Sequence, residues 1–107
     1  MDKLNFNDFK RTFTYKDKYK KVGFVAFPKA MFFDERLSVY HLKVAGILEI
    51  HAFSGKKQCF PSLATIAIEA AISKPTVIKC LNELQSLGYI EIEKKHRKVN
   101  HYYLKFW

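Results

Sequence analysis

The sequence predicts a single α+β domain in which three main helices precede a C-terminal two-stranded hairpin. A chain of 107 residues forms one hydrophobic core rather than two. Hydrophobic residues make up 49% of it and aromatic residues 16%, a composition that excludes intrinsic disorder. Apolar residues recur at helical spacing through the middle of the chain and alternate near its end, which places the helices before the strands.

The charge balance favours a polyanionic partner. Nineteen Lys and Arg face ten Asp and Glu, for a formal net charge of +9, and small basic domains commonly bind nucleic acid. No apolar run approaches the roughly 18 residues that a membrane span requires. The first residues also lack the apolar segment of a signal peptide. We therefore expect a cytoplasmic protein with no membrane partner.

The sequence indicates neither an enzyme nor a metal, cofactor or small-molecule site. Cys59 and Cys80 lie 21 positions apart and neither belongs to a C-x-x-C pair, so no zinc site is expected. Cys80 is expected to be a buried thiol and Cys59 to lie in a loop, both reduced in a cytosolic setting. No nucleophile motif or pair of carboxylates suited to acid–base chemistry occurs.

Residues 1–21 form a basic and aromatic arm ahead of a domain at 22–107. The arm holds seven Lys and Arg against three Asp, a net charge of +4. Three of its phenylalanines are spaced three and four apart, which puts them on one face of a helix. Two interpretations stay open: a frayed terminus, or an arm that lies along DNA or docks on a second subunit.

The start of the domain predicts a short extra strand. Residues 22–27 are largely β-branched and aromatic, which favours an extended backbone, and Pro28 ends the segment. A single helical turn is expected at 29–33.

The first main helix is expected at 37–53, where Ser38 is a good N-cap. Along one side, apolar or half-polar side chains recur at gaps of three and four: Leu37, Tyr40, Val44, Ile47 and His51. A second apolar side accompanies this one. Such a helix is either central in the fold or half of a dimer interface, and the central position is the commoner case. The loop at 54–58 ends it.

Two closely connected helices follow. Ser62 is the expected N-cap of a short helix, and Ala71 with Ile72 makes a tight connection to the next one. Ser73 caps this third helix, and Gly88 ends it at the position where a left-handed C-cap is needed. The expected buried stripe of the third helix comprises Val77, Cys80 or Leu81, Leu84 and Leu87.

The last part of the chain alternates as two strands joined by a basic turn. Residues 89–93 place two isoleucines on one face, and residues 100–106 place Tyr102, Leu104 and Phe106 on one face. The turn between them is highly charged, with no acidic residue after Glu93; its cations are Lys94, Lys95, Arg97 and Lys98. Helix, short helix, helix and hairpin is the order of a winged helix-turn-helix.

The residue pattern resembles that of winged-helix DNA-binding domains. The positions that carry the resemblance are Pro61, Ser62, Leu63, Ala64, Ser73, Thr76, Val77, Leu81, Leu84, Gly88, Ile90, Asn100, Tyr102 and Leu104. The most similar groups are the N-terminal domains of plasmid replication initiators and phage replisome organisers, followed by transcription regulators of the same fold. The resemblance covers roughly residues 24–106 and implies binding to double-stranded DNA.

In this fold the third helix, at about 73–87 here, enters the major groove with its N-terminal residues facing base edges. The residues that point outward from it are Ser73, Lys74, Pro75, Thr76, Ile78, Lys79 and Asn82. Lysine can donate to guanine or to phosphate, and the threonine methyl group can meet a thymine methyl group. Ile78 either contacts DNA or packs on the second helix.

The wing supplies the second expected set of contacts. Lys94, Lys95, Arg97 and Lys98 suit the DNA backbone or the minor groove, because like charges so close together favour a polyanion. Ser62, with the amides that begin the second helix, suits a backbone phosphate. Asn100 is also expected to contact DNA.

Function within this fold stays open between three expectations. Replication initiation in a plasmid or phage comes first, and transcription regulation is the alternative. The third is a winged helix that serves protein contacts through the apolar helix 37–53 and the aromatic arm. The resemblance is also compatible with a homodimer that reads two half-sites.

Overall fold

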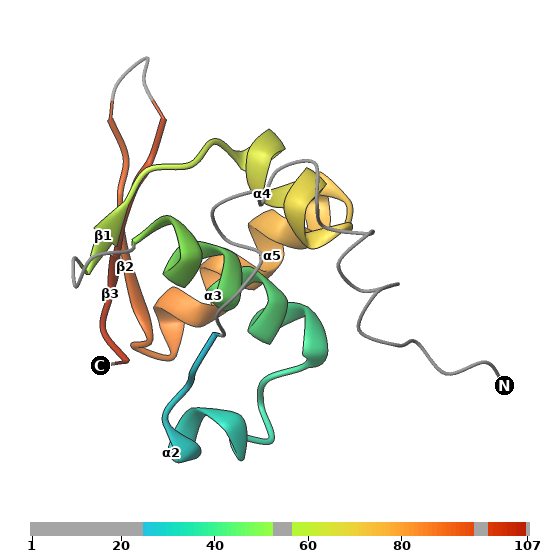
Figure 1. The fold of residues 1–107 in the computed structure, drawn as a ribbon, viewed down its shortest axis with the longest axis vertical. Coiled ribbons are helices and arrows are strands. Elements are labelled where there is room, and N and C mark those ends of the chain that lie inside the picture. The colour runs from blue at the N-terminus through green and yellow to red at the C-terminus, as the bar shows by residue number, and fades with distance from the viewer. Residues whose placement is uncertain (1–24, 53–56, 96–98, 107) are drawn as a thin grey trace, which may run out of the picture.

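The computed structural model describes residues 25–52, 57–95 and 99–106. The arm at 1–21, Arg97 and Lys98 therefore lie outside the described residues. The helices and strands are α2 (Lys29–Phe32), α3 (Val39–His51), β1 (Gln58–Cys59), α4 (Leu63–Ala70), α5 (Lys74–Ser86), β2 (Ile90–Glu93) and β3 (His101–Leu104). Within these ranges, four helices and a three-stranded antiparallel sheet make an α+β domain (Figure 1), which is consistent with a winged helix-turn-helix.

Helix α3 occupies the centre of the molecule, as its two apolar sides predict. It packs against α4, α5 and β3 and lies in the middle of Figure 1, with the sheet to its left and α2 below it. Its buried residues come from both apolar sides: Val44, Ala45 and Leu48 have no exposed surface, whereas Tyr40 is 53% exposed. Because the helix is apolar nearly all round, its sequence does not determine which side faces inward.

The expected strand at 22–27 is wrong for the part that the structure describes. Residues 25–28 belong to no strand. The Ala26 N–H donates instead to Oε1 of Glu49 on α3, at 3.1 Å. The Glu49 carboxylate thus accepts the backbone hydrogen bond that a neighbouring strand would otherwise have accepted. The single turn expected at 29–33 is confirmed as α2.

The additional strand of the sheet is β1, and it contains a residue that the sequence placed in a loop. Cys59 pairs with Tyr102, and Gln58 with Tyr103, so the sheet order is β1-β3-β2. The Leu104 N–H continues the ladder to the Lys57 carbonyl oxygen at 2.7 Å. A strand of two residues is too short to show an alternating pattern, and the edge of β3 provides the partner that makes it a strand.

The wing, comprising β2, β3 and the turn between them, follows its predicted alternation. The strands pair in register from Ile90 with Leu104 to Glu93 with His101. Ile90, Tyr102 and Leu104 are buried, and so is Phe106. Helix α5 stabilises the outer edge of β2. Oε1 of Gln85, on α5, accepts from the Ile92 N–H at 2.7 Å.

The helix-turn-helix connection ends α4 with a left-handed residue that is not glycine. Ala71 has a φ of 58°. Its N–H donates to the Ile68 carbonyl oxygen at 3.2 Å, and the Ile72 N–H donates to the Ala67 carbonyl oxygen at 3.1 Å. These two bonds form a Schellman motif. The tight connection predicted at Ala71 and Ile72 is therefore confirmed.

The same motif ends α5 at Gly88, whose φ is 85°. The Tyr89 N–H donates to the Leu84 carbonyl oxygen, and the Gly88 N–H to the Gln85 carbonyl oxygen, both at 3.0 Å. The predicted left-handed cap is confirmed, and it delivers the chain directly into β2.

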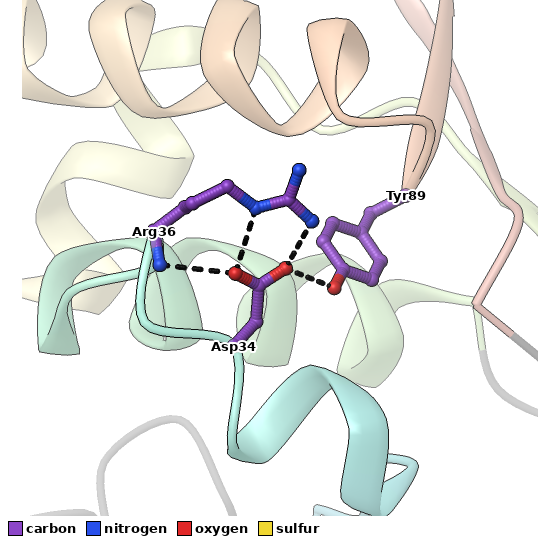
Figure 2. A network of polar contacts seen from close by, with 3 residues as sticks. All are labelled: Asp34, Arg36 and Tyr89. Carbon is purple, nitrogen blue, oxygen red and sulfur yellow. Dashed lines mark hydrogen bonds and ion pairs between the residues drawn. The ribbon is translucent and has the colours of Figure 1, made fainter.

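A polar clamp joins the loop before α3 to the start of the wing (Figure 2). Asp34 accepts from Nε of Arg36 at 2.8 Å and from the second guanidinium nitrogen at 2.6 Å. It also accepts from the hydroxyl of Tyr89, 55 positions away. These bonds, first to Arg36 and then to Tyr89, hold the pKa of Asp34 well below its ordinary value. Since its side chain is only 7% exposed, Asp34 is a fixed anion at this junction.

Candidate nucleic-acid interface

Helix α5 buries one side and presents the other. Val77, Cys80, Leu81 and Leu84 lie in the core, so the predicted stripe is confirmed apart from Leu87, which is the half-buried C-cap. The exposed side carries five of the residues expected to face DNA: Lys74, Pro75, Ile78, Lys79 and Asn82. Ile78 is 41% exposed and does not belong to the buried core, which leaves it accessible to a partner.

The start of α5 is held by two hydroxyl groups. Oγ of Ser73 accepts from the Thr76 N–H at 3.3 Å and lies 2.8 Å from Oγ1 of Thr76. Ser73 is therefore a helix cap first. The second contact restricts the rotamer of the half-buried Thr76, which orients its methyl group.

A hollow of about 550 Å³ joins the start of α4, the start of α5 and the wing. Its lining residues are Ser62, Leu63, Ala64, Lys74, Val99, Asn100 and Tyr102. Three of the predicted DNA contacts, Ser62, Lys74 and Asn100, thus meet in one place although they come from three separate elements. We refer to it as the interface hollow.

The polar groups around the interface hollow are ordered by contacts within the protein. Oγ of Ser62 accepts from the Thr65 N–H at 3.0 Å and donates to Oγ1 of Thr65 at 2.9 Å. The Asn100 amide donates to the Tyr102 hydroxyl at 3.4 Å. Burial raises the pKa of Tyr102, so this phenol stays neutral and polar at the wall of the hollow.

The described part of the basic turn contains one ion pair. Nζ of Lys95 lies 3.1 Å from Oε1 of Glu93, and both side chains are substantially exposed. The hydrogen bond from Lys95, followed by that from Tyr103, lowers the pKa of Glu93. Lys94 is exposed. One of the charges expected to repel its neighbours is therefore partly compensated within the wing, and salt screens such an exposed pair easily.

The position of α5 depends on a long-range contact that the sequence does not indicate. Nδ1 of His41 lies 2.9 Å from the Ser38 N–H and accepts from it, so the ring proton belongs on Nε2. Nε2 lies 2.8 Å from Oε1 of Glu83 on α5. His41 is 8% exposed. One buried imidazole thus caps α3 and fixes α5 against it.

Other polar clusters do not form a metal centre in the part of the chain that the structure describes. No group of three or more His, Cys, Asp or Glu there is placed to hold a metal ion. Nε2 of His51 lies 2.6 Å from Oε1 of Glu69. Cys59 and Cys80 are free and buried, and burial raises the pKa of the Cys59 thiol to about 12.

Two aromatic residues beside the interface were missed by sequence reasoning. Phe60 is 64% exposed, and its ring stacks on that of His101. No sequence signal could have found them, because β1 has only two residues and shows no alternating pattern. Since β1 was not predicted, neither was this pair.

The three helices that position the interface match a known family. Residues 35–90, more than half of the chain, match the helix-turn-helix domain family. The chain belongs to this family. The matched segment begins before α3 and ends at Ile90, the first residue of β2. The helix-turn-helix is therefore supported by both the family match and the structure, whereas the wing is supported by the structure. A search of curated proteins found no match.

As a helix-turn-helix domain, the chain has a fold that indicates DNA binding. Within it, α4 is the first helix of the motif and α5 stands in the position of the recognition helix. In the described part of the chain, no helix is both long and apolar enough to cross a membrane.

Proposed function

We propose that this helix-turn-helix protein binds double-stranded DNA in a sequence-dependent manner, and that it acts by binding rather than by catalysis. In this proposal α5 enters the major groove and the wing lies on the backbone or in the minor groove. The observation that carries it is the interface hollow, which brings Ser62, Lys74 and Asn100 together beside the exposed side of α5.

Base recognition is assigned to the first two turns of α5. Lys74 and Lys79 are exposed there and can donate to guanine O6 and N7 or to phosphate. Thr76 and Ile78 can meet thymine methyl groups, and Asn82 lies one turn further along the helix. Because Ser73 and the buried stripe fix the helix, these side chains approach the groove with their backbone already ordered.

Positioning on the duplex is assigned to the hollow and the wing. Ser62 and the first amides of α4 suit a phosphate oxygen, and Lys74 also lines the hollow. Lys94, Lys95, Arg97 and Lys98 add positive charge at the wing turn. Contacts of this kind carry affinity and register rather than sequence information.

Within DNA binding, we assign the protein to replication initiation. The resemblance of residues 24–106 to the N-terminal domains of plasmid replication initiators and phage replisome organisers supports this assignment over transcription regulation. A plasmid that carries the gene and its binding site should then be maintained in a host that cannot otherwise replicate it. If the plasmid is lost while a promoter next to the same site is repressed, the protein is a transcription regulator.

Selection of bound duplexes from a random pool, followed by footprinting, tests DNA recognition directly. We expect a recurring sequence and an affinity that falls steeply with added salt. A footprint over two half-sites about one helical turn apart indicates a homodimer on DNA. Selected pools with no common sequence, or an affinity insensitive to salt, would contradict the proposal and favour a winged helix used for protein contacts.

A further inference from the structure

An exposed aromatic pair lies next to the proposed duplex interface and has no role in it. The rings of Phe60 and His101 are stacked, with centroids 5.4 Å apart and 25° between their planes. Phe60 remains 64% exposed despite this contact. A flat aromatic surface left open to water gains free energy when another flat ring covers it.

Strand register places the pair on the outer face of the sheet. Cys59 and Tyr102 face each other across the β1–β3 ladder, and both are buried against the helices. Because successive side chains in a strand point to opposite faces, Phe60 and His101 point away from the core. Tyr103 shares this side and is only half-buried. We call Phe60, His101 and Tyr103 the outer aromatic face.

Acidic and basic side chains are unevenly distributed around the outer aromatic face. Lys105, just after β3, is exposed and shares the side of His101 and Tyr103 by strand alternation. On β2, Glu93 and Glu91 lie directly opposite His101 and Tyr103. The Tyr103 hydroxyl donates to Oε1 of Glu93 at 2.9 Å, and Nζ of Lys95 lies 3.1 Å from the same oxygen. The acidic side chains of this face thus lie on β2, so its β1 side, where Phe60 lies, is the side open to an anionic strand.

The outer aromatic face is continuous with the interface hollow. Phe60 lies two residues before Ser62, and His101 directly follows Asn100; Ser62 and Asn100 both line the hollow. A nucleic-acid strand that leaves a duplex held at the hollow therefore reaches the aromatic pair, on the other side of the sheet, by passing around the edge at β1.

We infer that the Phe60–His101 pair binds an unpaired base of single-stranded DNA. Bases within a duplex are already stacked on each other, whereas an unpaired base has a free face that can stack on an aromatic side chain. The protein then holds a duplex and an adjacent single strand together, a geometry that arises wherever a duplex is opened. This inference rests on the proposed function for its duplex half.

Three labelled probes test the inference by fluorescence anisotropy. They are the selected duplex with blunt ends, the same duplex with a thymidine tail on either strand, and the thymidine oligomer alone, each single strand being about 15 nucleotides long. A tail on one strand should raise the affinity about tenfold over the blunt duplex. Phe60→Ala should remove that gain and leave the affinity for the blunt duplex unchanged.

Three further variants show whether a loss of the tail's contribution is specific to the aromatic pair. Phe60→Trp should retain the gain, because indole also stacks on bases, and His101→Ala should reduce it. Phe33→Ala removes another phenyl ring, 72% exposed, that follows α2, an element well apart from β1 in Figure 1. This control should bind all probes like the parent. Thermal melting of each variant shows whether it is folded.

Several results would overturn the inference. Equal affinity for tailed and blunt duplexes is one, and a gain that survives both Phe60→Ala and His101→Ala is another. An equal loss on both probes with Phe60→Ala would place Phe60 in the duplex interface, and a change in oligomeric mass would show that a second copy covers it. Failure of the proposed function gives a different result, because the blunt duplex is then not bound. The thymidine oligomer alone still tests the aromatic pair in that case, through the comparison of the parent with Phe60→Ala.

Discussion

Two residues with the same left-handed backbone end the two helices of the motif, and they differ only in their side chains. Ala71 has a φ of 58° and Gly88 a φ of 85°, each within a Schellman motif. Alanine is strained in this region because its Cβ approaches the following carbonyl oxygen. A Cβ added at Gly88 meets nothing within 4 Å, so the cost of a side chain there comes from the backbone alone.

Exchanging the two residue types should change stability in opposite directions. Ala71→Gly should raise the free energy of unfolding by about 0.5–1 kcal/mol, and Gly88→Ala should lower it by about 1 kcal/mol. Urea unfolding at fixed temperature measures both. A loss of stability in Ala71→Gly would show that the turn between α4 and α5 is not left-handed.

The charge of Asp34 ties the loop before α3 to the wing, and its loss should appear at low pH. Its pKa lies below the ordinary value, so the stability it contributes is complete above about pH 4 and is lost as the pH falls from there towards the pKa of the folded state. Asp34→Asn should therefore be less stable than the parent at pH 6 and should lose less stability between pH 6 and pH 3. Unfolding at both pH values measures this.

The neighbouring acid provides the control for Asp34. Glu35 is exposed, and Glu35→Gln should keep the acid sensitivity of the parent. If Asp34→Asn and the parent lose the same stability on acidification, the clamp does not hold the carboxylate as described.

At the scale of single residues, local roles could be predicted and distant partners could not. Ser62 and Ser73 were identified as caps because a cap is recognised by its own short sequence context. The contact of His41 with Glu83 joins positions 42 apart. No pattern within one helix indicates that pair, since it exists only after α3 and α5 have packed together.

At the scale of elements, the helices and the wing followed from periodicity, while the phase of α3 and the existence of β1 did not. Helix α5 has polar and apolar sides, so its buried stripe could be predicted. Helix α3 is apolar on both sides, and only the packed neighbours show that Leu48 faces inward and Tyr40 outward. Strand β1 is defined by its pairing with β3 rather than by its own sequence.

The observed orientation of α3 leads to a prediction for two substitutions on this helix. Leu48→Ala should lower the free energy of unfolding by about 2–5 kcal/mol, because it leaves a cavity at a fully buried site. Tyr40→Ala, on the exposed side of the same helix, should change it by no more than about 0.5 kcal/mol. Chemical denaturation compares them, and the reverse order of effects would contradict the orientation of α3 described here.

At the scale of the whole molecule, the net charge is concentrated in two segments. The arm at 1–21 carries +4 and the turn at 94–98 another +4, which leaves one positive charge for the rest of the chain. The helices that build the core are thus nearly neutral. The fold class and the interface hollow were predictable in outline, because they depend on helix order and spacing. The outer aromatic face was not, because it depends on a strand without a sequence signal.

The specificity ratio of a Lys74 variant tests the central claim most directly. The affinity for the selected duplex, divided by that for a scrambled duplex at the same salt concentration, isolates base recognition from general attraction to phosphate. Lys29, exposed on α2, provides a variant with the same change of charge away from α5. If α5 reads bases, Lys74→Ala should lower the ratio by about 5–150-fold, equivalent to about 1–3 kcal/mol, while Lys29→Ala preserves it. An unchanged ratio in Lys74→Ala, or equal losses in both variants, would contradict recognition by Lys74 at the start of α5.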